Sequence, residues 1–204
     1  VTGLGHRGDG IAGTNDGELY IPFALPGERV EIERDGDRGR IVRLIEASPQ
    51  RQEALCRHFG VCGGCVAQHL APEAYLAWKR EMVVTALRQH GVDAEVGPTI
   101  AVAGNSRRRA SFTLRRIGGE VVLGYHKRAS HRLVGISECP VLLPAIARAM
   151  PRLKAMLAPL APAKGALSVQ ITALDDGLDV ALEGARPPAP RLMAQLAAAA
   201  SETG

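Results

Sequence analysis

The chain has 204 residues, of which 46% are hydrophobic and 23% charged, so it holds enough apolar material for one sizeable core or two small ones. This composition excludes a disordered or fibrous protein, and no apolar run reaches the length of a membrane-spanning helix. The formal net charge of +4 is a mild excess that is compatible with a polyanionic partner.

Short strands separated by turn residues are predicted for residues 1–48. The candidate strands are 19–21, 30–32 and 41–45, and Gly, Asp, Asn and Pro residues fill the segments between them. Strands this short and this evenly spaced predict a small closed β-barrel, because closure removes exposed strand edges.

The remaining residues predict a mixture of helices and strands, so the expected fold class is α+β. A helix with Pro72 in its first turn is expected to end near Gln89. Apolar and polar residues alternate along 110–117, and a Gly-Gly turn connects this strand to a partner at 121–125. Further predicted elements are a strand at 133–136, a helix at 144–157 that Pro151 kinks or breaks, a hairpin of 168–174 with 178–183, and a terminal helix at 191–200.

The four cysteines form a pattern of three plus one: Cys56, Cys62 and Cys65 lie within ten residues, and Cys139 follows much later. Glycines between the second and third cysteines let the backbone fold tightly, so that three thiols can point at one centre. Four thiolates suit either a [4Fe–4S] cluster or zinc. The spacing favours the cluster, since zinc ligands more often come as two short-spaced pairs. The thiols could instead form disulfides or be unrelated buried groups, and the lack of a secretory signal weakens the disulfide interpretation.

Positive charge is concentrated between residues 107 and 132, where eight Lys or Arg residues stand against one acid. One basic run opens the first strand of the central hairpin and the other follows its partner strand. If these strands pair, the two runs lie at the same end of the hairpin and form one patch that can hold RNA phosphates, with Tyr125 or Phe59 available to stack on bases. The alternative is a solvated surface. The candidate RNA contacts are Arg107, Arg108, Arg109, Lys127, Arg128, His131 and Arg132.

Several of these segments resemble one known family. Residues 56–65, followed by Gln68-His69, resemble the cluster motif of the tRNA/rRNA (uracil-5-)-methyltransferases. Residues 135–142 are similar to that family's central domain. Residues 8–12 and 24–28 resemble its TRAM domain, an OB-like RNA-binding barrel. The resemblance runs along most of the chain, in the same order.

The resemblance implies a TRAM-like RNA-binding barrel at 1–48 and an iron–sulfur central domain at 49–204, with an antiparallel sheet. It also implies that Cys56, Cys62, Cys65 and Cys139 are the four ligands of a [4Fe–4S] cluster. The family's methyltransferase domain, with the S-adenosylmethionine site, is expected beyond residue 204.

Because all four cysteines are assigned to the cluster, none is left as the nucleophile that attacks the uracil ring. We therefore expect no catalytic residue in this chain and no activity of the chain alone. The expected partner is RNA, with 23S rRNA favoured over tRNA, and no membrane or obligate protein partner is expected. The expected location is cytoplasmic, since no signal peptide is found. The alternative is a stand-alone RNA-binding or zinc-ribbon module without enzymatic activity.

Overall fold

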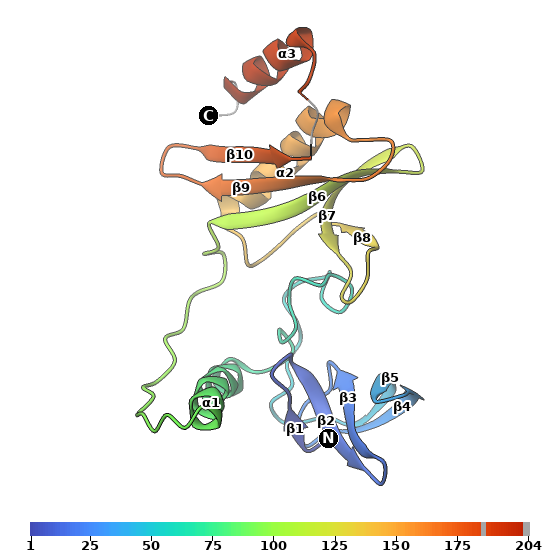
Figure 1. Cartoon of the computed structure of the whole chain (residues 1–204), viewed down its shortest axis with the longest axis vertical. Coiled ribbons are helices and arrows are strands. Elements are labelled where there is room, and N and C mark those ends of the chain that lie inside the picture. The colour runs from blue at the N-terminus through green and yellow to red at the C-terminus, as the bar shows by residue number, and fades with distance from the viewer. Residues whose placement is uncertain (185–186, 202–204) are drawn as a thin grey trace. The chain divides into compact units, whose positions relative to one another are not determined.

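The structure, a computed structural model, describes residues 1–184 and 187–201 (Figure 1). It divides into two compact units. The first contains Val1–Gly60 and Cys65–Ala101, and the second contains Val61–Gly64 and Val102–Gly204. Helices and mostly antiparallel sheets confirm the α+β class. The division at residue 48 and the iron–sulfur character of residues 49–204 stay predictions.

The first unit is built on a five-stranded sheet. Its strands are β1 (Gly3–Leu4), β2 (Asp9–Thr14), β3 (Gly17–Pro22), β4 (Arg29–Asp35) and β5 (Arg38–Glu46), in the order β1-β2-β3-β5-β4. Neighbouring strands are antiparallel except β3 and β5, which share one parallel pair, Tyr20 with Arg38. The three strands predicted from the sequence are confirmed, and each is longer than predicted.

The closed barrel predicted for this region is wrong. β1 and β4 are the two edges of the sheet, and no ladder joins them among the described residues. β1 is only two residues long, because the chain turns back just beyond it, where the amide of Gly8 donates to the carbonyl of Gly5. Val1, just before β1, is bonded to the residues just before β4: its ammonium donates to the Glu28 carbonyl at 2.9 Å, and its carbonyl accepts from the Gly27 amide at 2.9 Å.

Helix α1 (Pro72–Gln89) confirms the predicted helix after the cysteines. Pro72 occupies its first turn, where the missing N–H costs no hydrogen bond, and Gly91 follows its end with φ of 69°. All 18 residues of α1 are described and none of them is buried. The core of the first unit therefore lies in the sheet, around Leu19, Ile21 and Ala24.

The second unit is built on an antiparallel sheet of order β10-β9-β6-β7-β8. The strands are β6 (Arg109–Ile117), β7 (Glu120–His126), β8 (Leu133–Gly135), β9 (Leu167–Ala173) and β10 (Leu178–Glu183). Both predicted hairpins are confirmed. The predicted alternation along β6 is confirmed as well, since Ala110, Phe112 and Leu114 are all buried.

Helix α2 (Pro144–Leu157) covers one face of this sheet (Figure 1). Ile146, Met150, Leu153 and Leu157 form its buried stripe and belong to the same core as the sheet residues. The expected break at Pro151 is not found, because the helix continues through this residue to Leu157. Burial of the stripe on both sides of the proline offsets the lost backbone hydrogen bond.

A short 3₁₀ turn, Ala158–Leu160, follows α2, and α3 (Pro190–Ser201) confirms the predicted terminal helix. None of the helices in the described part of the chain is both long enough and apolar enough to cross a membrane.

Candidate nucleic-acid interface

The segment between β7 and β8 folds as a compact basic turn, residues 127–132. The amide of Lys127 donates to the carbonyl of Arg132 at 2.8 Å, and the amide of Ser130 donates to the carbonyl of Lys127 at 3.1 Å. The Ser130 hydroxyl accepts from the Arg132 amide at 3.1 Å. Ala129 has φ of 49°, a left-handed conformation that costs a non-glycine residue about 1 kcal/mol. The hydrogen bonds hold the turn in this strained shape.

The cysteine loop (residues 56–65) contacts this turn through residues 61–64, which belong to the same unit as the turn. The amide of Gly63 donates to the carbonyl of His126 at 2.9 Å, and Cys62 forms an isolated antiparallel bridge with Lys127. A Cβ atom at Gly63 would lie 2.9 Å from the His126 carbonyl oxygen and 3.1 Å from the Arg128 nitrogen. The close approach therefore requires glycine at position 63.

The loop and the turn line an open depression in the surface, with a volume of about 450 Å³. The lining residues include one lysine, one arginine, one tyrosine and two histidines, and none of them is acidic. The lining consists of Gly63, Gly64, Tyr125, His126, Lys127, Arg128, Ala129, Ser130 and His131. A concave, basic site with an aromatic ring has the chemistry that binds nucleotides through phosphate and base together.

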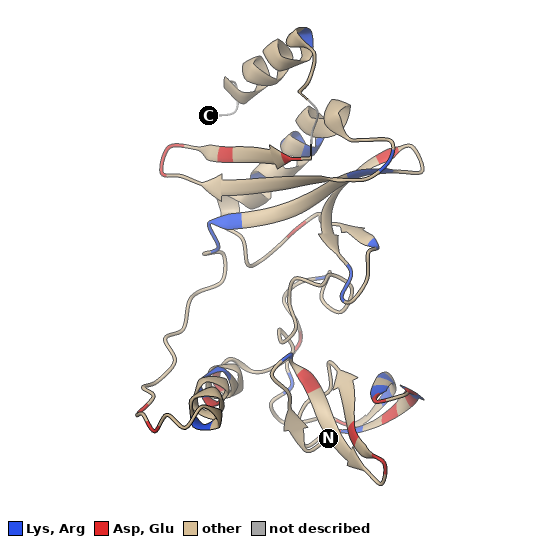
Figure 2. Cartoon of the chain, in the orientation of Figure 1, with Lys and Arg blue, Asp and Glu red and all other residues tan. Residues whose placement is uncertain are grey.

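The structure brings three of the predicted RNA contacts into this pocket, namely Lys127, Arg128 and His131. Arg132 supports the turn through its backbone and is exposed. Figure 2 shows that basic residues are present both in this turn and at the start of β6.

The other predicted run, Arg107 to Arg109, is not among the residues that line the pocket. Arg108 donates to the carbonyl of Ala173 at 3.2 Å and forms an ion pair with Asp175 at 3.1 Å. The ladder between β6 and β7 begins only at Thr113, and the earlier part of β6 pairs with β9.

Two of the four cysteines lie in each unit: Cys56 and Cys65 in the first, Cys62 and Cys139 in the second. Each is half-buried, and none of them is in a disulfide. Over residues 1–184 and 187–201, no three His, Cys, Asp or Glu residues form a group that could hold a metal ion. The four-cysteine ligand set stays a prediction.

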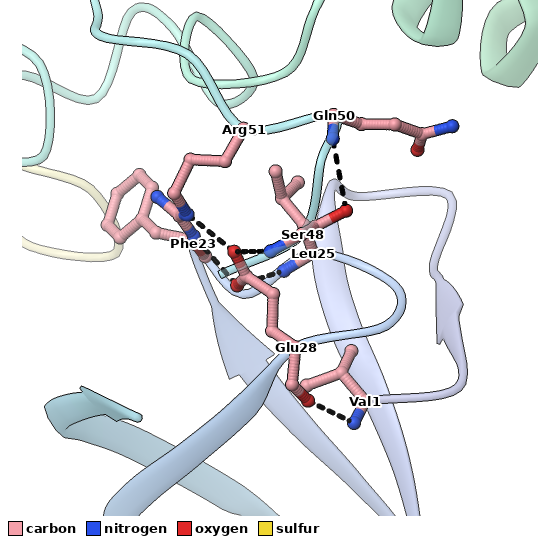
Figure 3. A network of polar contacts seen from close by, with 7 residues as sticks. All are labelled: Val1, Phe23, Leu25, Glu28, Ser48, Gln50 and Arg51. Atoms are coloured by element: carbon pink, nitrogen blue, oxygen red, sulfur yellow. Dashed lines mark hydrogen bonds and ion pairs between the residues drawn. The ribbon is translucent and has the colours of Figure 1, made fainter. Parts of the chain in front are cut away.

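A buried ion pair between Glu28 and Arg51 lies in the first unit (Figure 3). The side chain of Glu28 is fully buried and accepts hydrogen bonds from Arg51 and from the amides of Leu25 at 2.8 Å and Ser48 at 3.3 Å. Burial alone would raise the pKa of Glu28, but these hydrogen bonds and the Arg51 charge hold it below its usual value. Arg51 also donates to the carbonyl of Phe23 at 2.7 Å, a residue with φ of 65°.

An aromatic cluster of Phe23, Phe59 and His69 joins this network to the cysteine loop. The ring centroids of Phe59 and His69 are 5.2 Å apart, and those of Phe23 and Phe59 are also 5.2 Å apart. His69 is buried, and burial together with the nearby positive charge of Arg51 lowers its pKa to about 4. This imidazole is therefore neutral at physiological pH and acts as an apolar packing group.

Sequence reasoning did not find two features of these sites. The Gly63-Gly64 pair indicated only a tight loop, whereas Gly63 also forms the pocket wall. Glu28 and Arg51 are far apart in the sequence, and no local pattern marks them as partners. The signal in the sequence was the charged residue Glu28, which directly follows the turn residues Pro26 and Gly27.

Comparison with known proteins gives matches over most of the chain. An uncharacterized RNA methyltransferase of Brucella suis is 44% identical over 184 residues, which are 90% of this chain and 44% of that relative. An uncharacterized RNA methyltransferase of Rhizobium meliloti is 39% identical over 207 residues, which are 98% of this chain and 50% of the relative. No family model matches the chain.

The chain is therefore similar, over most of its length, to proteins named as RNA methyltransferases. The relatives include the 23S rRNA (uracil(1939)-C(5))-methyltransferase RlmD of Halomonas elongata, 41% identical over 72% of this chain and 32% of that protein. This confirms the resemblance to uracil-5-methyltransferases noted in the cysteine motif. The chain spans about half the length, or less, of the curated relatives it matches.

Proposed function

We propose that this chain is the RNA-binding portion of an S-adenosylmethionine-dependent RNA (uracil-5-)-methyltransferase that acts on 23S rRNA. The observation that carries the proposal is the similarity, over most of the chain, to RNA methyltransferases that include enzymes named for a uracil of 23S rRNA. The basic pocket between the cysteine loop and the turn at 127–132 supports it, because it offers cationic groups and an aromatic ring to RNA.

In this proposal the chain holds and positions RNA, and methyl transfer takes place in the part of the enzyme that this chain does not span. Methylation of a uracil at C5 needs a nucleophile that adds to the ring, and S-adenosylmethionine supplies the methyl group. The proposal assigns the four cysteines to another role, so the chain contributes binding rather than chemistry.

We also propose that Cys56, Cys62, Cys65 and Cys139 bind a [4Fe–4S] cluster. The support is the three-plus-one spacing, the glycines within the loop and the resemblance of residues 56–65 to the family's cluster motif. In this role the thiolates would fix the cysteine loop to the segment that follows β8. Iron and acid-labile sulfide analysis of protein purified without oxygen separates this cluster from zinc.

The enzymatic proposal is tested in cells and with the purified chain. Deletion of the gene is expected to remove one 5-methyluridine from 23S rRNA, detected by mass spectrometry of RNase fragments, and re-expression is expected to restore it. An unchanged 5-methyluridine content of rRNA and tRNA in the deletion strain would contradict the proposal.

The purified chain is expected to bind 23S rRNA fragments but not to transfer a labelled methyl group to them from S-adenosylmethionine. Robust methyl transfer by the chain alone would show that the catalytic groups lie within residues 1–204. An absence of RNA binding would contradict the RNA-binding role itself.

A further inference from the structure

The pocket between the cysteine loop and the basic turn has the dimensions of a small-ligand site. Its volume of about 450 Å³ lies within the range of pockets that hold a single small molecule or one nucleotide. In an RNA duplex the bases are stacked inside the helix, so a base can stack on a side chain of the pocket only after it has left that stack.

Tyr125 lines the pocket, and its ring is held in place by the core. The ring of Tyr125 packs on Phe112 with a centroid distance of 4.7 Å and an interplanar angle of 31°, and Phe112 is 1% exposed. Tyr125 also pairs with Val134 in the ladder between β7 and β8. A Cβ at Gly124 would lie 1.8 Å from the Val134 carbonyl oxygen, so only glycine allows this close pairing of the strands. The ring is thus a fixed surface on which a base can stack.

The charged wall of the pocket lies on the turn. Lys127 and His131 are exposed, Arg128 is half-buried, and none of the residues that line the pocket is acidic. The turn is fixed by three hydrogen bonds and held against Gly63, so its cations are positioned before any ligand arrives. Both walls together fit the two ends of one nucleotide, the base and the phosphate.

Building on the proposed function, we propose that this pocket holds one unpaired nucleotide of a single-stranded RNA segment. The base stacks on Tyr125, and Lys127 and Arg128 bind its phosphate. The pocket therefore selects single-stranded over duplex RNA, and Gly63 is a positioning residue that keeps the cysteine loop against the turn.

The test measures binding of the full chain to a 5′-fluorescein-labelled single-stranded RNA of twelve nucleotides and to the same strand in a perfect duplex, by fluorescence anisotropy over a range of salt concentrations. Tyr125→Leu is expected to weaken binding of the single strand about tenfold and to reduce the preference over duplex. Tyr125→Phe keeps the aromatic face and is expected to bind as the unmodified chain does. Lys127→Gln is expected to reduce the slope of log affinity against log salt by about 0.7.

Two further variants separate the site from general effects. Lys154→Gln removes an exposed charge of α2, outside the pocket, and is expected to leave the single-strand preference unchanged. Gly63→Ala keeps all charges and is expected to weaken single-strand binding through displacement of the loop. Thermal unfolding by circular dichroism identifies any variant whose loss of binding comes from unfolding.

The nucleotide pocket is contradicted if the folded variants Tyr125→Leu and Lys127→Gln bind RNA as Lys154→Gln does. The comparison covers the affinity, the preference for single-stranded RNA and the salt slope. In that case the proposal that the chain binds RNA still stands. Equal affinity of the unmodified chain for single-stranded and duplex RNA overturns the nucleotide pocket in the same way. If the unmodified chain binds neither RNA, the proposed function fails as well.

Discussion

Glu28 is a buried carboxylate that stabilises the fold through several hydrogen-bond partners at once. Its side chain is fully buried, while that of Arg51 is 24% exposed, so the pair is screened only on the side of the guanidinium. Two backbone amides complete the coordination of the carboxylate. Such an arrangement is costly to disrupt from one side, because the remaining charge is then buried without compensation.

Glu28→Gln keeps the size of the side chain but removes the charge that Arg51 needs. We expect the free energy of unfolding to fall by about 2–4 kcal/mol, measured by urea denaturation at pH 7.5. Glu33→Gln is the matched control, since Glu33 pairs with Arg40 on the surface with both side chains more than half exposed. That control is expected to cost less than about 0.5 kcal/mol. Equal losses for the two variants would contradict the role of the buried pair.

His69 makes the stability of the first unit dependent on pH. The pKa of a histidine is ordinarily about 6.5, and in the folded chain it is lowered to about 4. Between these two values the unfolded chain binds a proton that the folded chain does not. The contribution of His69 is therefore complete above pH 6.5 and is lost as the pH falls towards 4.

His69→Phe removes this titration and keeps a ring between Phe23 and Phe59. We expect the unmodified chain to lose about 1–2 kcal/mol more stability than the variant between pH 7.5 and pH 5, measured by urea denaturation at both values. The other histidines are common to both proteins, so the difference between the two losses isolates His69. A difference close to zero would show that His69 titrates normally in the folded chain.

At the scale of elements, the sequence predicts those segments in which one local pattern dominates. The alternation of Ala110, Phe112 and Leu114 identifies β6, and Pro72 marks the start of α1. β2 was missed because its residues Gly10 and Gly13 resemble turn residues. Gly10 is required there by packing, since a Cβ would lie 2.7 Å from the carbonyl oxygen of Ala24.

The arrangement of these elements could not be predicted in the same way. The order of the first sheet depends on one parallel pair between β3 and β5, which joins strands that are not consecutive. The position of β6 in the middle of the second sheet depends on its pairing with β9 along Arg109–Leu114 and with β7 along Thr113–Ile117. Both are properties of long-range pairing, and no local pattern in the chain reports them.

Pro151 is the clearest conflict between local preference and tertiary packing. It is exposed and lies between the buried residues Met150 and Leu153 in a helix that continues to Leu157. Pro151→Ala restores the missing amide and removes the clash of the ring with the preceding turn. We expect the free energy of unfolding to rise by about 1–3 kcal/mol, seen as a higher thermal midpoint of the second unit. Arg152→Ala, an exposed neighbour, is the control and is expected to change it by less than about 0.5 kcal/mol. An unchanged or lower midpoint for Pro151→Ala would mean that the helix is adapted to the proline.

At the scale of the whole molecule, the chain passes from the first unit to the second and back within the cysteine loop. Residues 61–64 belong to the second unit, and the residues on both sides belong to the first. Gly63 fixes this excursion to the end of β7, and Cys139 packs at the edge of the core of the second unit. Cys139 is far in sequence from the other three proposed ligands. Loss of Cys139 would therefore remove the link that closes the longest loop of the chain.

Cys139→Ser tests the proposed ligand set with the least disturbance of the local packing, because serine is smaller and similar in shape. Anaerobically purified chain is expected to contain about four iron and four sulfide per molecule, and the variant is expected to lose most of both. We also expect faster cleavage of the variant by a protease at low concentration, because the cysteine loop is no longer fixed to the segment after β8. Ser137→Ala, two residues earlier, keeps all four thiols and is expected to retain the iron.

If the unmodified chain contains one zinc and no iron, the cysteines form a structural zinc site instead of a cluster, since four thiolates suit either centre. A Cys139→Ser protein with full iron content would remove Cys139 from the ligand set and leave the cysteine loop to bind its metal without it.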